Sequence, residues 1–226
     1  IAYMEARGQA DPKDRRRELE SIYGARPRHF WAAYDLVAAC VECGDLEAAE
    51  KYALAAREVR PRDADVRNVL GNVLLQAGKL DEAEKELGEA LKLRTPFAAA
   101  SYNLGLVAAA RKKYADAVEN FRRALTADPK MAEAACNMGH CLARLDKPDE
   151  AIAAYRRAIA IRADYGQAHN NLAVALYRKK DYWGAWKHLQ EAEKCGYAPA
   201  ESFKRVLSKK LFEKPGQTPS RDSSKG

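Results

Sequence analysis

The sequence lacks any apolar run approaching the roughly 20 residues that a helix needs to cross a bilayer, so we expect no membrane span. It shows no basic stretch followed by an apolar core at its start, so no signal peptide is predicted, while an upstream anchor or signal segment stays open. Five cysteines form a small, odd set, which favours a reducing compartment over a disulfide framework. The sequence therefore predicts a soluble, cytoplasmic protein.

Motifs that carry chemistry are also missing. There is no phosphate-binding glycine loop, no nucleophile elbow and no paired-carboxylate arrangement, so we predict that the chain is not an enzyme. Cys40 and Cys43 form a C-x-x-C, and Cys136 and His140 are one helical turn apart, but zinc requires four ligands and no second pair stands at the required separation. We expect no metal and no cofactor.

Aromatic residues are few, at 8% of the chain, and no base-stacking pattern accompanies the basic residues. The net charge of +7 is concentrated at the C-terminal end. Together these features disfavour nucleic acid as a partner.

What the sequence does contain is a repeat with a period of 34 residues. One column holds a large apolar residue and the next position a small residue in four of the five copies, as in Leu104 and Gly105. The period brings the first column to Leu36, Leu70, Leu104, Met138 and Leu172, and an alanine follows each by thirteen positions, at Ala49, Ala83, Ala117, Ala151 and Ala185. Because two helices can approach closely only where one presents a small side chain, these columns predict pairs of antiparallel helices.

Turn residues agree with this interpretation. Gly44 and Gly78 stand at the same position of two copies, where a residue able to take positive φ ends the first helix. Pro61 and Pro129 stand where the second helix must stop, and Pro148 opens a helix.

The order of these columns resembles the tetratricopeptide repeat, most clearly at 102–105, Ala117, Phe121, Ala124 and 128–129. The resemblance implies an all-α fold, a right-handed α-solenoid (superhelix) of helix-turn-helix repeats. We predict five units, at 30–63, 64–97, 98–131, 132–165 and 166–198. Residues 1–29 are predicted as a divergent or truncated first unit, 199–214 as a capping helix with a stripe of Phe203, Val206, Leu207 and Leu211, and 215–226 as a disordered tail.

A solenoid of such hairpins leaves an extended concave groove lined by the first helices, and we predict that a partner protein or peptide binds there. The candidate groove residues share a face of each first helix or lie at its end; they are Trp31, Tyr34, Asn68, Asn72, Tyr102, Asn103, Leu106, Asn137, His140, Arg144, Asn171, Val174, Tyr177 and Arg178. Trp31 is the best candidate for an aromatic anchor, whereas Trp183 and Trp186 are predicted to pack between helices.

Asn103, Asn137 and Asn171 recur at the repeat period and form a possible amide ladder. Carboxamides both donate and accept, so such a ladder would suit the backbone of an extended peptide; equally, asparagine is common at this position of the repeat. Arg111, Arg144 and Arg178 also recur, and they either favour an acidic ligand or simply end a helix, where a cation suits the dipole. A chaperone-tail clamp is disfavoured, because Tyr34 and Ala99 stand where such a clamp carries basic residues.

The sequence therefore predicts a non-catalytic scaffold or adaptor that binds an extended segment of another protein. Two alternatives stay open. The first is a self-assembling scaffold, a homo-oligomer or coat, because the incompletely matched N-terminal unit needs covering. The second is a substrate-docking arm of a larger enzyme, as in glycosyltransferases that bear tetratricopeptide repeats.

Overall fold

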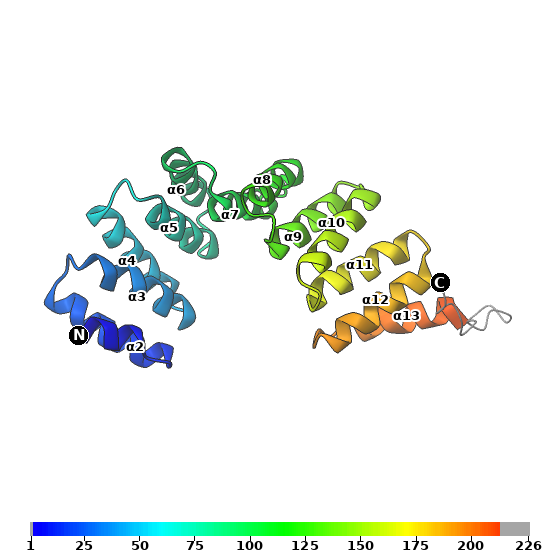
Figure 1. Ribbon diagram of the computed structural model, residues 1–226, viewed down its shortest axis with the longest axis horizontal. Helices are drawn as coiled ribbons and strands as arrows, with labels where there is room; N and C mark the ends of the chain where they lie inside the picture. Colours follow the sequence, from blue (N-terminus) through cyan, green and yellow to red (C-terminus); the bar gives the residue numbers. More distant parts are fainter. Residues whose placement is uncertain (1, 213–226) are drawn as a thin grey trace. The chain divides into compact units, whose positions relative to one another are not determined.

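The computed structural model describes residues 2–212, and in this range it contains thirteen α-helices (Figure 1). The predicted all-α fold of sequential helix pairs is confirmed. The chain divides into two compact units that meet in sequence at Pro129 and Lys130. The first unit contains α1 (Ala2–Arg7), α2 (Pro12–Ala25), α3 (Phe30–Glu42), α4 (Leu46–Val59), α5 (Ala64–Gln76), α6 (Leu80–Leu93), α7 (Ala98–Ala110) and α8 (Tyr114–Ala127). The second contains α9 (Ala132–Arg144), α10 (Pro148–Ile161), α11 (Gly166–Arg178), α12 (Tyr182–Lys194) and α13 (Glu201–Phe212).

Over residues 2–212, no helix is both long enough and apolar enough to span a membrane.

A left-handed residue closes the turn inside each of the five hairpins from α3 to α12. Gly44 and Gly78 have φ of 76° and 75°, as their predicted role requires. Non-glycine residues take the same conformation at the repeat period, with φ of 61° at Lys112, 57° at Asp146 and 65° at Lys180. The repeat therefore imposes this backbone shape even where the side chain opposes it.

The helix ends follow local capping chemistry. Asp45 and Asp181 stand just before α4 and α12, and each side chain accepts a hydrogen bond from a backbone N–H of the first turn. Pro148 is the first residue of α10, where its missing N–H costs nothing. Pro61 and Pro129 lie two residues beyond the ends of α4 and α8.

In the hairpins α5–α6, α7–α8 and α9–α10, the core is built where a glycine of the first helix meets a large side chain of the second. A Cβ added to Gly71 would lie 2.5 Å from Leu87 Cγ, and one added to Gly139 would lie 2.7 Å from Tyr155 Cε1. The alanine column is fully buried at all five positions, Ala49, Ala83, Ala117, Ala151 and Ala185. Close approach of the two backbones is thus the physical meaning of the sequence columns.

An ion cluster that the repeat pattern did not predict joins three helices of the first unit. The Glu86 carboxylate of α6 is only 5% exposed, and it accepts hydrogen bonds from Arg57 of α4 at 2.7 Å and from Arg67 of α5 at 2.6 Å. A buried carboxylate is tolerated only with such partners, so the two guanidinium groups fix the packing of α4, α5 and α6.

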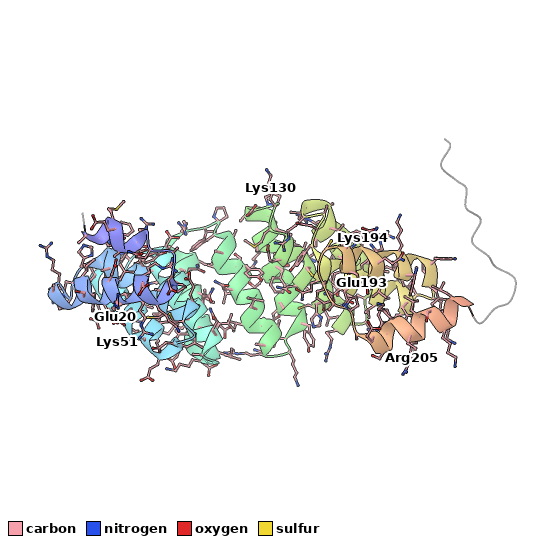
Figure 2. The ribbon with its side chains drawn as sticks, turned by 90° about the horizontal axis from the view of Figure 1, so that it is seen from below. Glu20, Lys51, Lys130, Glu193, Lys194 and Arg205 are labelled. Carbon is pink, nitrogen blue, oxygen red and sulfur yellow. The ribbon has the colours of Figure 1, made fainter. Side chains whose placement is uncertain are left out.

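The last helix, α13, covers the end of the second unit. Leu207 is fully buried. Lys204 Nζ lies 2.6 Å from Oε1 of Glu193 on α12, and Glu193 is labelled in Figure 2. The predicted apolar stripe was wrong at Val206, which is 43% exposed. Phe203, Leu207 and Leu211 share one face at a spacing of four residues, and Val206 lies off that face. The end of the predicted capping helix, 213–214, and the predicted disordered tail, 215–226, lie outside the described residues.

Candidate functional site

Successive first helices of the hairpins contact one another inside each unit. In the first unit α3 contacts α5 and α5 contacts α7, and in the second unit α9 contacts α11. Side chains one repeat apart are therefore neighbours. We call the surface formed by α9 and α11 the first-helix face of the second unit, and that formed by α3, α5 and α7 the first-helix face of the first unit.

The first-helix face of the second unit contains a pocket of about 390 Å³. Its apolar lining comes from Ala143, Ala151, Val174 and Ala175, with Pro148 at the start of α10. Five of the predicted groove residues also line it: His140, Arg144, Asn171, Val174 and Arg178. Residues separated by a whole repeat in the sequence thus meet in one cavity.

The charges of this pocket are mainly positive. Arg144, Arg178 and Lys179 line it together with a single acidic residue, Asp146. Lys179 Nζ lies 3.0 Å from Asp149 Oδ1, so its charge is already matched. Burial raises the pKa of the Tyr155 phenol well above its ordinary value, so this residue of the lining stays neutral even in basic solution.

The first unit has a smaller pocket, of about 280 Å³, between α3 and α5. It gathers three predicted groove residues, Tyr34, Asn68 and Asn72, together with Asp35 and Gln76. Gln76 Nε2 donates to Asn72 Oδ1 at 2.6 Å. No lysine or arginine lines this pocket, so its chemistry is amide and acidic where that of the second unit is basic.

The predicted amide ladder makes contacts within the protein. Asn103 of α7 is only 5% exposed, and its Nδ2 donates to Asn68 Oδ1 of α5 at 3.0 Å. Asn171 of α11 likewise points to the preceding first helix, with its Nδ2 3.7 Å from Cys136 Sγ of α9. Asn137 lies half-buried on α9. Contacts between neighbouring repeats therefore use part of the hydrogen-bonding capacity of these amides. The sequence pattern alone did not reveal these contacts.

Models of a known protein family match the repeats of this chain. One tetratricopeptide-repeat model matches residues 34–92 and again 68–132, and a second matches residues 108–170, so that together they cover more than half of the chain. The chain belongs to the tetratricopeptide-repeat family. This family is generally non-catalytic and mediates contacts between proteins.

Solved structures agree with the family assignment. PilF from Pseudomonas aeruginosa is 21% identical, with a TM-score of 0.74 over 84% of this chain and 86% of PilF. MamA is 22% identical, with a TM-score of 0.62 over 74% of this chain and 94% of MamA. YrrB, a tetratricopeptide-repeat protein with an unusual peptide-binding site, is 20% identical, with a TM-score of 0.62 over 84% and 97% of the two chains. These likenesses show a shared fold, and no curated protein sequence matches this tetratricopeptide-repeat chain.

The remaining predicted groove residues differ in their surroundings. Trp31 is 49% exposed, with its ring under the Arg60 guanidinium at 4.9 Å. Tyr102 packs on Phe121 with ring centroids 5.7 Å apart, and Leu106 beside it is half-buried. Tyr177 packs edge-on against Phe203 of the capping helix at 5.5 Å. Tyr102 and Tyr177 thus contribute to internal packing, whereas Trp31 presents an aromatic surface.

Packing between helices was a wrong prediction for Trp183, which is 47% exposed on α12. Trp186 is half-buried. The two positions are three residues apart and are neighbours on the helix surface, and Trp186 lies nearer than Trp183 to the buried side formed by Ala185 and Leu189.

The three arginines that recur at the repeat period have different surroundings in the two units. Arg111 forms ion pairs with Asp81 and with Glu84, 2.6 Å away, in the first unit, whereas Arg144 and Arg178 line the pocket of the second.

Cys40 is fully buried, and burial raises the pKa of its thiol to about 11. Within residues 2–212, no three histidine, cysteine or acidic side chains are grouped so as to hold a metal ion.

Proposed function

We propose that this tetratricopeptide-repeat chain is a non-catalytic scaffold that holds an extended segment of another protein on its first-helix faces. The observation that carries the proposal is the pocket of the second unit, where His140, Arg144, Asn171, Val174 and Arg178 line one cavity of about 390 Å³. This volume lies within the range of about 300–1,000 Å³ that is typical of ligand sites.

The composition of the pocket supports a peptide ligand. Its aliphatic lining offers a place for an apolar side chain, and Asn171 and Tyr155 add polar residues to the same lining. A few polar groups around an apolar cavity fix the orientation of a bound segment. YrrB, with a similar fold, has a peptide-binding site of its own.

The five cysteines are all free thiols, which supports a reducing, cytoplasmic setting for this binding.

The test is selection of short peptides from a random display library by the intact chain, followed by anisotropy titration of the selected peptides. Val174→Trp places a bulky ring in the pocket and should abolish binding. Ala153→Trp adds the same ring at an exposed position of α10 that does not line the pocket, and it should leave binding unchanged. If no peptide is enriched, or if both variants bind as the wild type does, the proposal is wrong.

A further inference from the structure

The first-helix faces of the two units differ in charge, and this difference points to the chemistry of the ligand. In the first unit, Asp35 is the charged residue that lines the pocket. In the second unit, Arg144 and Arg178 come from the ends of two successive first helices and line the same cavity. Of these two first-helix pockets, only that of the second unit is lined by basic residues.

The basic residues differ in whether the protein already matches their charge. Arg111, the equivalent residue one repeat before Arg144, is held by two carboxylates, and Lys179 is held by Asp149. Arg178, by contrast, makes no ion pair with any side chain in residues 2–212, although it is exposed and lines the pocket. Of Arg111, Lys179 and Arg178, Arg178 is therefore the one available to pair with a carboxylate of a bound partner.

Guanidinium groups suit such a role. Arginine presents a planar fork of N–H donors that matches a carboxylate, and charge-assisted hydrogen bonds are about twice as strong as neutral ones. The apolar lining from Ala143, Ala151 and Val174 lies next to these donors. It excludes water when occupied, and a lower local dielectric strengthens the pairing.

We propose that the second unit recognises an acidic segment of its partner, in which an Asp or Glu carboxylate binds at Arg178 and Arg144 while a neighbouring aliphatic side chain fills the pocket. The inference rests on the proposed function and adds the class of ligand to it. It assigns that class to the first-helix face of the second unit, since the pocket between α3 and α5 has no lysine or arginine in its lining.

The experiment compares three synthetic peptide pools that share a randomised frame and differ at one fixed pair, Glu-Leu, Gln-Leu or Lys-Leu. Anisotropy titration against the wild-type chain should show the Glu-Leu pool binding about tenfold tighter than the Gln-Leu pool, as expected for one charge-assisted hydrogen bond. The Lys-Leu pool should bind weakest. Arg178→Gln, and separately Arg144→Gln, should remove most of the preference for Glu-Leu.

The matched control is Arg157→Gln, which removes the same charge from an exposed position of α10 outside the pocket. It should keep the preference, and a loss equal to that of Arg178→Gln would mean that general charge, not the pocket, selects the acidic pool. Equal binding of all three pools to the wild type would overturn the acidic specificity and leave the scaffold function standing. Absence of binding by every pool would overturn both.

Discussion

The glycines of the first helices show how one hydrogen atom in place of a side chain sets the distance between two helices. Gly105 lies against the Phe121 ring, and a Cβ at this position would stand 2.6 Å from Phe121 Cε1. Phe121 is fully buried, so its ring cannot move aside. Gly88 on α6 is the opposite case, because a Cβ there would meet nothing within 4 Å.

Two glycine substitutions should therefore change stability in opposite directions. Gly105→Val should lower the free energy of unfolding by about 1–3 kcal/mol, as overpacked cores do. Gly88→Ala should raise it by about 0.5–1 kcal/mol, because alanine costs less backbone entropy in a helix. Urea unfolding followed by circular dichroism measures both. Equal effects of the two changes would mean that the contact of Gly105 with Phe121 does not set the helix spacing.

The two histidines between α11 and α12 form a pair whose proton positions are set by geometry. His169 Nε2 lies 3.0 Å from the Ala163 carbonyl, which can only accept, so this nitrogen carries a hydrogen. In the neutral pair, Nδ1 of His169 must then accept from Nδ1–H of His188, 3.0 Å away. Protonating both rings would turn two N–H groups toward each other. Burial, and then the neighbouring charge of His169, lower the pKa of His188, with smaller contributions from Lys187 and Arg156 opposed by Glu191.

This pair should make the second unit less stable in mild acid. The unfolded chain takes up a proton at His188 near the ordinary pKa of 6.5, whereas the folded chain takes it up only at lower pH. The unfolded state therefore binds more protons in that window, and stability falls as the pH drops below 6.5 toward the folded pKa. Thermal melts of the wild type and of His188→Gln from neutral pH to pH 5 measure this. The variant should show the smaller decrease in melting temperature, and parallel decreases would contradict the assignment.

At the scale of the element, α13 shows why a solenoid needs a last helix. The side chain of Leu207 is fully buried, Phe203 packs on Tyr177 of α11, and Lys204 is paired with Glu193 of α12. Without this cover, the apolar side chains of α11 and α12 would face water. The energy of the cap is therefore concentrated in a few contacts along one side of the helix.

Leu207→Ala should lower the free energy of unfolding by about 2–5 kcal/mol, the range typical of a buried leucine. Val206→Ala is the matched control, because Val206 is its neighbour on the same helix and is 43% exposed. Chemical denaturation of both variants provides the comparison. A similar loss from the two changes would indicate that α13 does not pack as described.

The elements themselves were largely readable from the sequence, because spacing and turn chemistry are local properties. Leucine and alanine columns with a fixed period predicted the hairpins, and Gly44 marked a turn that the backbone does make. What escaped prediction depends on contacts between helices far apart in the chain. The partners of Glu86 lie 29 and 19 residues away, and nothing in the columns indicates that they meet.

The residues of the candidate site that were predicted all lie on first helices, whereas a pocket residue on a second helix was missed. The face of each first helix followed from helical periodicity, which is how Val174 and His140 were found. Tyr155 was missed because it belongs to a second helix and reaches the pocket from α10. The bond from Asn103 to Asn68 was missed because the repeat pattern gives the position of a side chain and not the direction of its amide.

At the scale of the whole molecule, the substantial helix contacts join elements that are one or two apart in chain order, as between α11 and α12 or α9 and α11. In such a chain, stability is close to a sum of hairpin energies and nearest-neighbour interfaces. A local loss should therefore spread only to neighbouring helices. Compact domains behave differently, because every element there shares one core.

Amide hydrogen exchange with peptide-level mass spectrometry tests this locality. In Leu207→Ala, exchange should rise in α12 and α13, rise less in α11, and stay at the wild-type rate in α3–α6, since those helices belong to the other compact unit. Gly105→Val should give the converse pattern, with faster exchange centred on α7 and α8. Each variant thus controls for the other. A uniform increase along the whole chain in both would mean that the molecule opens as one cooperative body and that the nearest-neighbour description is wrong.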